Sequence, residues 1–208
     1  MNNRFDKDAS SWDSKDYRTR MAENVSFAIT NEVELHPQMS VLDFGCGTGL
    51  VSLPFAPKVA KLTGVDTSAG MLDVFLEKAK SAGLTNVESL NLDLGAGAAL
   101  SDTYDLVLSS MTFHHVKDIS AVINTLVQAL NPGGMLCIAD LDSEFGLFHA
   151  DNTGVHHYGF DRDRMMERFR NAGLTNVRAV TAANMLRVGA DNVERDFSIF
   201  LITGEKHR

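Results

Sequence analysis

The sequence predicts one domain of the α/β class, a doubly wound three-layer sandwich with a seven-stranded, mostly parallel sheet. Apolar runs alternate with amphipathic helical segments from residue 40 onward, a glycine-rich loop follows the first run, and acidic residues end several runs. This alternation is typical of a parallel sheet with helices on both faces. A chain of 208 residues with 44% hydrophobic content can bury one such core.

The N-terminal half is expected to supply one helix before the sheet and the first three strands. Apolar residues at helical spacing predict a helix that begins at about Arg20 and ends before His36: Val25, Ile29 and Val33. Three apolar runs predict strands at about 40–45, 60–66 and 86–92. Between the second and third runs, a helix is expected to begin near Ser68 and to stop at Gly83.

The C-terminal half is expected to supply four strands and two helices. Apolar runs predict the strands at about 104–109, 135–140, 177–183 and 194–203. The clearest helix follows Asp118, a good N-cap, and carries an unbroken apolar stripe until the Asn-Pro-Gly-Gly segment 131–134 ends it. A second helix begins near Asp161.

The connection 141–160 is the least regular part of the chain. A connection of this length in a compact domain is usually functional or disordered. Its aromatic and histidine residues argue against disorder: Phe145, Phe148, His149, His156, His157, Tyr158 and Phe160. We interpret it as a cover over a binding site.

The loop Gly45-Cys46-Gly47-Thr48-Gly49 is the most informative segment. Glycine lets a ligand approach the main chain closely, and a strand that runs into such a loop and then a helix starts a nucleotide-binding unit. The dinucleotide fingerprint requires a third glycine where this chain has Leu50. The loop is therefore suited to a ligand without a pyrophosphate.

Acidic residues follow the first three predicted strands. Asp66 closes the second strand about 20 residues beyond Gly45, where a carboxylate accepts hydrogen bonds from the two ribose hydroxyls. Asp43 and Asp93 end the first and third strands, and the polar segment 109–115 follows the fourth. Because parallel strands end at one edge of a sheet, these residues are expected to converge on one ligand site.

Composition narrows the class of partner. The formal net charge of −8 argues against nucleic acid, which is usually met by a basic face. The first residues lack the apolar core of a secretory signal, and no apolar run reaches the ~20 residues of a membrane span. Cys46 and Cys137 suggest neither a disulfide framework nor a zinc cluster. We expect a cytoplasmic protein without a membrane partner; the oligomeric state stays unknown.

Five segments together resemble the class I S-adenosylmethionine-dependent methyltransferases, in their small-molecule branch (methyltransferase type 11/25-like). They occur in the family's order: V-L-D-F-G-C-G-T-G, G-V-D-T-S-A-G-M-L, N-L-D-L, Y-D-L-V-L-S-S-M-T-F-H-H-V and L-N-P-G-G. The resemblance covers nearly the whole chain and implies a Rossmann-like domain over 1–208 with an antiparallel last strand. It also implies S-adenosyl-L-methionine as cofactor, a small-molecule methyl acceptor, and S-adenosyl-L-homocysteine as product.

The resemblance assigns a set of cofactor-binding residues: Asp43, Gly45, Cys46, Gly47, Asp66, Thr67, Met71, Asp93, Leu94, Ser109 and Met111. Those of the glycine loop and the fourth-strand exit would border the methionine portion. Asp66 would bind the ribose, and the remainder would surround the adenine. Simpler interpretations stay open for four of these residues: Asp43 as a cap on the glycine loop, Asp66 as a surface carboxylate after a strand, Asp93 as an ordinary residue of a strand exit, and Met71 as plain helix core.

The chemistry that the resemblance implies is an in-line displacement at a methyl carbon made electrophilic by the sulfonium. The enzyme chiefly aligns the nucleophile, and only a nucleophile that bears a proton needs a base, a role that suits histidine. His114 and His115 follow the fourth strand and are candidate catalytic residues, with ordinary loop histidines as the alternative. His156 and His157 are candidate substrate contacts.

The N-terminal residues Trp12, Tyr17 and Arg20 resemble a segment that closes over the cofactor in this branch. Residues 1–35 are therefore expected to form a lid and a helix, while 141–160 would cover the acceptor site. A lid of this kind excludes water. An aromatic anchor that packs the first helix on the domain is the alternative.

No metal site is predicted. A set formed by His149, Asp151, His156 and His157 matches no familiar ligand spacing, and Ser109 stands where metal-dependent catechol methyltransferases have an acidic residue. The same exit lacks the Pro-Pro of enzymes that methylate nucleobase amines. The alternative function is a protein that binds S-adenosylmethionine without methyl transfer, as a cofactor-remodelling enzyme or a non-catalytic sensor.

Overall fold

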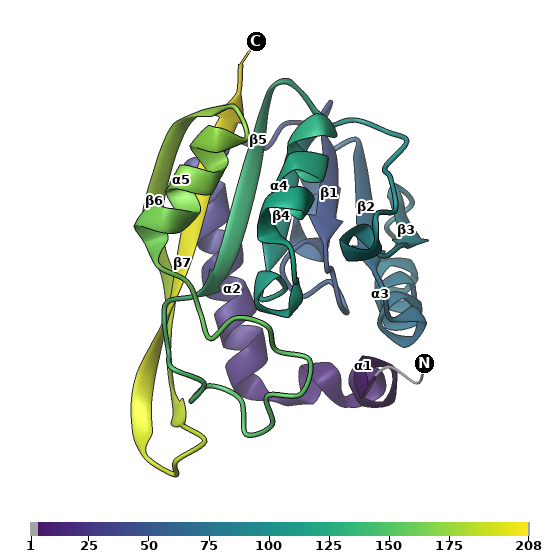
Figure 1. Ribbon diagram of the computed structural model, residues 1–208. Helices are drawn as coiled ribbons and strands as arrows, with labels where there is room; N and C mark the ends of the chain where they lie inside the picture. The colour runs from purple at the N-terminus through teal and green to yellow at the C-terminus, as the bar shows by residue number, and fades with distance from the viewer. Residues whose placement is uncertain (1–3, 208) are drawn as a thin grey trace.

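A seven-stranded sheet in the order β3-β2-β1-β4-β5-β7-β6 forms the centre of the computed structural model, which describes residues 4–207 (Figure 1). The strands are β1 Ser40–Phe44, β2 Lys61–Asp66, β3 Val87–Asn91, β4 Tyr104–Ser110, β5 Leu130–Leu141, β6 Leu174–Val188 and β7 Glu194–Lys206. Strands β1 to β5 run parallel, and β7 lies antiparallel to both of its neighbours. The predicted fold class, with its antiparallel last strand, is confirmed.

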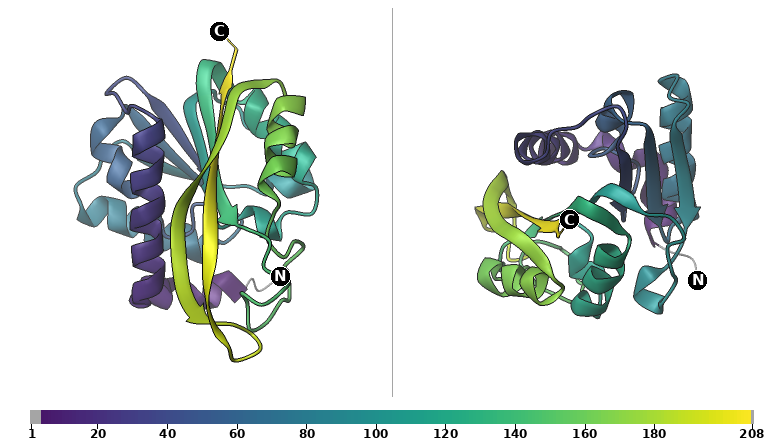
Figure 2. Two further views of the ribbon diagram at one scale, coloured as in Figure 1. Left: turned by 90° about the vertical axis from the view of Figure 1, so that its left-hand side faces the viewer. Right: turned by 90° about the horizontal axis from the view of Figure 1, so that it is seen from above.

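Helices cover both faces of the sheet, as Figure 2 shows. They are α1 Arg4–Asp8, α2 Asp16–Glu32, α3 Ala69–Ser81, α4 Ile119–Gln128 and α5 Arg162–Asn171. Short 3₁₀ turns add η1 Ala9–Ser14, η2 Leu53–Lys58, η3 Leu94–Ala96 and η4 Phe113–His115. One apolar core lies between the sheet and α2 and α3, and the other lies between the sheet and α4 and α5.

Local chemistry explains where the central helices begin. Asp118 caps α4 by accepting a hydrogen bond from the Ala121 N–H, as predicted, and Ser68 caps α3 in the same way. Strands β1, β2 and β4 are mostly buried along their length, because helices cover both faces of the sheet. Because β1 to β5 are parallel, their carboxyl ends lie at one edge of the sheet, where the site is found.

Three boundaries differ from the prediction. Helix α2 begins earlier, at Asp16, and residues 4–14 form α1 and η1 where no element was predicted. Strand β5 begins at Leu130, which pairs with Tyr104 across a register shift, so the Asn-Pro-Gly-Gly segment lies inside the strand. Strand β6 is longer than 177–183 because it forms a long hairpin with β7, and several of its residues face solvent, which weakens the apolar pattern.

Two segments meet beyond the carboxyl ends of the parallel strands (Figure 1): the N-terminal segment, residues 4–14, and the long connection, residues 142–161. Asp6 Oδ1 accepts from the Ser68 hydroxyl at 2.5 Å, which fastens the N-terminal segment to α3. The backbone N–H groups of His156 and His157 donate to the His114 carbonyl and fasten the long connection to η4. Among residues 4–207, every helix is too short or too polar to cross a membrane.

Candidate functional site

A cavity of about 910 Å³ opens at the carboxyl ends of β1, β2 and β4. The glycine loop, residues 45–49, forms one wall, and the N-terminal segment and the long connection form others. Ligand pockets usually measure ~300–1,000 Å³. The cavity is thus large enough for a cofactor and a small second molecule.

The glycine loop owes its shape to three glycines with positive φ, Gly45, Gly47 and Gly49. A Cβ on Gly45 would lie 2.2 Å from the Thr112 hydroxyl, so only glycine lets the loop pack against the β4 exit. At Gly47 a Cβ would meet nothing within 4 Å, so its backbone faces open space. A ligand can therefore approach the main chain at Gly47.

The carboxylate of Asp66 is held at the loop by backbone donors. Its Oδ2 accepts from the Gly47 N–H at 2.9 Å, and its Oδ1 accepts from the Ser68 N–H at 2.9 Å. Burial raises the pKa of Asp66, while these N–H groups oppose the rise. A carboxylate offers about four lone-pair positions, so acceptor capacity remains for the hydroxyls of a ribose.

Asp43 lies deeper, at the end of β1, and is 2% exposed. Burial raises the pKa of its carboxyl to about 7, and the negative charge of Asp66 adds to the rise. A cationic group bound nearby would favour the ionised form. The position suits a ligand that carries positive charge.

Several predicted cofactor residues line the cavity, and two do not. Those that line it are Asp43, Gly45, Cys46, Gly47, Asp66, Thr67, Met71, Asp93 and Met111. The side chain of Leu94 belongs to the core, and Leu92, Gly95 and Ala96 line the wall around it. Ser109 is fully buried and donates to the Phe44 carbonyl at 2.7 Å, so Ser110 takes the lining position.

The N-terminal lid residues are also corrected in part. Trp12 and Tyr17 line the cavity, whereas Arg20 is exposed and lies outside it. Arg18, two residues before Arg20, stacks over the Trp12 ring at 3.5 Å and lines the wall. The predicted helix begins only at about Arg20, whereas α2 begins at Asp16, and residues two apart on a helix point in different directions.

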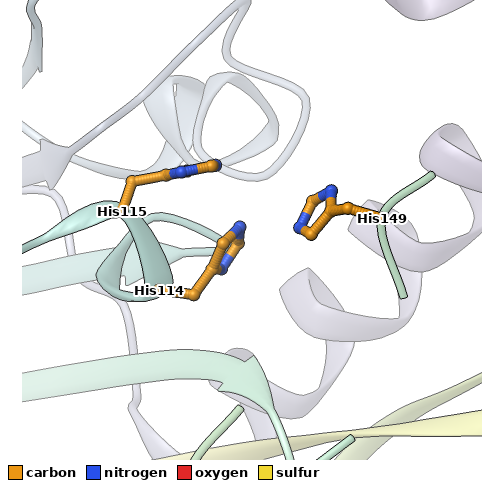
Figure 3. A group of neighbouring side chains, drawn as sticks. All are labelled: His114, His115 and His149. Carbon is orange, nitrogen blue, oxygen red and sulfur yellow. The ribbon is translucent and has the colours of Figure 1, made fainter. Parts of the chain in front are cut away.

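Three histidines form a cluster at the other end of the cavity (Figure 3). His114 and His115 come from η4, and His149 comes from the long connection. One ring nitrogen of each lies within 4.8 Å of the others. We call these three residues the histidine cluster.

His114 is paired with a carboxylate that sequence reasoning did not assign to the site. Its Nδ1–H donates to Asp140 Oδ1 at 2.8 Å, and the backbone N–H of His114 donates to Asp140 Oδ2 at 3.2 Å. Burial by itself would raise the pKa of Asp140, but His114 and the Leu141 N–H hold it below its usual value. The pair is buried, so the imidazole is held in one orientation.

The second imidazole is fixed in the same tautomer. His115 Nδ1 lies 2.8 Å from the Gly154 carbonyl oxygen, which can only accept a hydrogen bond. Nδ1 therefore carries the proton, and the lone pair of the neutral ring is on Nε2. His114 has the same arrangement, because ionised Asp140 also only accepts.

The remaining histidines have different roles. His156 lines the cavity, and its contact with a substrate stays a prediction. His157 does not line it, because its Nε2–H donates to the Val116 carbonyl at 2.9 Å and its ring packs on Phe160. Of the four residues weighed as a metal set, only His149 belongs to the histidine cluster, and its partners are His114 and His115.

Comparison with known proteins agrees with this geometry. The family model of the methyltransferase domain matches residues 14–179. The uncharacterized methyltransferase C1347.09 of Schizosaccharomyces pombe is 36% identical over 160 residues, which cover 70% of this chain and 56% of that protein. The ubiquinone biosynthesis O-methyltransferase of Rhizobium leguminosarum bv. trifolii is 30% identical over 131 residues, which cover 58% and 52%. The chain spans about half the length of these curated relatives.

Solved structures share the fold at low sequence identity. The YcgJ protein of Bacillus subtilis has a TM-score of 0.76 at 16% identity, over 89% of this chain and 99% of that one. Phosphoethanolamine N-methyltransferase 2 of Haemonchus contortus, in complex with S-adenosyl-L-methionine, has a TM-score of 0.71 at 16% identity, over 88% and 52%. Since the family model spans most of the chain, the protein belongs to the class I S-adenosylmethionine-dependent methyltransferases.

Proposed function

We propose that the protein transfers the methyl group of S-adenosyl-L-methionine to a hydroxyl oxygen of a small molecule and releases S-adenosyl-L-homocysteine. One observation carries the proposal: a single cavity joins the glycine loop and Asp66 to the histidine cluster. The first end suits the cofactor, and the second suits an acceptor that has to lose a proton.

The cofactor end has the groups that an adenosyl ligand needs. Open space at Gly47 admits it against the main chain, and Asp66 can accept from its ribose hydroxyls. Asp43 would face the positively charged methionine portion, and Thr67, Met71 and Asp93 would surround the adenine. The bound cofactor supplies an electrophilic methyl carbon, while the chain holds the acceptor in line behind it.

The acceptor end favours an oxygen nucleophile. A hydroxyl must give up its proton, whereas a neutral amine has a lone pair and needs less help. We assign this activation to His114 and His115, whose Nε2 lone pairs are set by hydrogen bonds at Nδ1. The match to an O-methyltransferase relative supports the choice of oxygen.

The test measures binding and turnover separately. Titration calorimetry is expected to report binding of S-adenosyl-L-methionine and S-adenosyl-L-homocysteine, and a panel of small hydroxyl compounds is expected to include one that yields S-adenosyl-L-homocysteine. Asp66→Asn should weaken cofactor binding roughly 10- to 100-fold, because one hydrogen bond to a charged group contributes ~1.5–3 kcal/mol. Asp73→Asn, on the exposed face of α3, is the matched control.

Two results would contradict the proposal. Failure of both ligands to bind folded protein would exclude the cofactor. Binding without turnover, across hydroxyl, amine and thiol acceptors alike, would favour the alternative of a protein that binds the cofactor without methyl transfer.

A further inference from the structure

We propose that His114, His115 and His149 bind one divalent transition-metal ion, with zinc as the ion that this ligand set fits best. The inference deepens the proposed function, on which its catalytic role rests: the ion, bound by the Nε2 lone pairs of His114 and His115, would activate the acceptor hydroxyl in place of direct proton transfer to either ring. Figure 3 shows the three rings around a common space, two from η4 and one from the long connection.

The spacing of the rings is close to that of a metal site. Their candidate ligand nitrogens lie within 4.8 Å of one another. With Zn–N distances of ~2.0–2.1 Å, tetrahedral ligands are separated by roughly 3.4 Å. A movement of the nitrogens by on the order of 1 Å, small enough to keep the Nδ1 hydrogen bonds of His114 and His115, would close the site.

The hydrogen bonds at Nδ1 prepare two of the ligands. A histidine that binds a metal through Nε2 commonly donates its Nδ1–H to a carboxylate or a backbone carbonyl. His114 donates to the Asp140 carboxylate and His115 donates to the Gly154 carbonyl, each at 2.8 Å. Both kinds of supporting partner are therefore present, and Asp140 also brings a buried negative charge close to the ion.

The donor set selects among metals. The cluster found among residues 4–207 consists of imidazoles alone, whereas Mg²⁺ and Ca²⁺ require oxygen ligands. Imidazole suits zinc and its neighbours in the transition series. Three protein nitrogens also leave a fourth tetrahedral position, which is the pattern of a catalytic zinc site.

The fourth position would take the acceptor hydroxyl. On binding, the O–H bond breaks and the proton passes to solvent, because a cation lowers the pKa of a bound hydroxyl. The oxygen then forms a bond to the methyl carbon as the carbon–sulfur bond breaks, and the bonding pair stays on sulfur. The ion is regenerated when the methyl ether leaves.

Metal binding can be tested without turnover. Protein stripped with a chelator and dialysed is expected to bind one equivalent of Zn²⁺ by calorimetry. Co²⁺ in the same site should give the intense visible bands of a four-coordinate nitrogen site. His149→Ala and, as a second variant, His115→Gln should each lose the bands and weaken Zn²⁺ binding at least 10-fold. His156→Ala, in the same connection and on the cavity wall but outside the cluster, should bind like the unchanged protein.

The outcomes separate this inference from the proposed function. No Zn²⁺ binding, or equal Zn²⁺ binding by folded His149→Ala and His115→Gln proteins, overturns the metal site. Full turnover by chelator-stripped protein overturns the catalytic role of the ion, and the proposed methyl transfer then stands with a histidine as the base. Absence of cofactor binding overturns the proposed function, while one-equivalent Zn²⁺ binding would still establish the site.

Discussion

Two buried carboxyl groups of the site respond to burial in opposite ways. The described residues that shift the pKa of Asp43 include no cation, and burial raises that pKa to about 7. Asp140 is equally buried, but His114 and backbone N–H groups stabilise its ionised form and lower its pKa. One carboxyl is thus prepared for a cationic ligand, and the other already serves a neighbouring side chain.

The raised pKa of Asp43 predicts a pH dependence. Between about pH 4 and 7 the native state retains a proton that the unfolded state has released, so the free energy of unfolding falls as pH rises through this range. The upper limit of the effect is on the order of 4 kcal/mol. Asp43→Asn should remove this part of the dependence and stabilise the free protein at pH 8. Urea denaturation at pH 5 to 8 measures it, and parallel curves for the two proteins would contradict it.

Asp140→Asn is expected to destabilise the fold. The carboxylate accepts from the His114 ring, the His114 N–H and the Leu141 N–H, whereas an amide can accept at only one of its two terminal atoms. A buried donor left without an acceptor costs ~1–3 kcal/mol. Denaturant unfolding should show a loss of that size, and NMR of the imidazole nitrogens should show that the His114 tautomer is no longer fixed.

The matched control for that change is Asp142→Asn. Asp142 follows the same strand and accepts two hydrogen bonds from Arg162 in a partly exposed pair, where water can solvate the groups left after the change, so a smaller loss than for Asp140→Asn is expected. Equal losses in the two variants would show that the buried pair has no special structural role.

At the scale of elements, the site is assembled by segments that lie on the sheet edge and are fastened to it by side chains. Asp13 in η1 accepts from Thr48 of the glycine loop and from Lys78 of α3, both at 2.6 Å. The N-terminal segment is thus connected to the cofactor end at two points. Its inner face, with Phe5, Asp8 and Trp12, lines the cavity.

The N-terminal segment is expected to be held more firmly when the cofactor is bound. S-adenosyl-L-methionine should slow proteolysis within residues 5–18, because a ligand in contact with the segment opposes its local opening. Asp13→Ala should speed the cleavage, while Asp16→Ala, exposed on the first turn of α2, should change it little. Equal cleavage rates with and without cofactor would exclude a lid.

At the scale of the molecule, one edge of the sheet brings together residues from both halves of the chain. The first two strands and the loops after them supply the cofactor end of the cavity. The exits of β4 and β5 and the long connection supply the histidines and Asp140. The strand order reverses between β1 and β4, and ligands of open parallel sheets bind at that place.

Cofactor binding at this place should stabilise the whole domain. At a concentration 100 times the Kd, S-adenosyl-L-homocysteine adds ~2.7 kcal/mol, which for a domain of this size raises Tm by roughly 5–10 °C. NAD should cause no shift, because Leu50 stands where its pyrophosphate loop needs glycine. A thermal scan with each ligand measures the difference, and equal shifts would contradict the assigned cofactor class.

The sequence alone was sufficient for the sheet, its central helices, and the placement of the glycine loop and Asp66 at the wall of the cavity. The glycines of the loop after the first strand are a local signal, because the loop needs their backbone conformation. Asp66 is also a local signal, because it stands where the second strand ends. Element boundaries were less predictable where long-range pairing overrides local pattern, as in β6, whose extension depends on β7.

Only the tertiary structure decided the acceptor end. Asp140 and His149 are far along the chain from His114, and no spacing rule connects them. Ser109 and Leu94 turned inward, and Arg18 replaced Arg20, through the phase of a strand, a turn and a helix that sequence pattern leaves undetermined. A loop motif is formed by neighbours along the chain, whereas a cluster of side chains exists only after the sheet has brought its strand ends together.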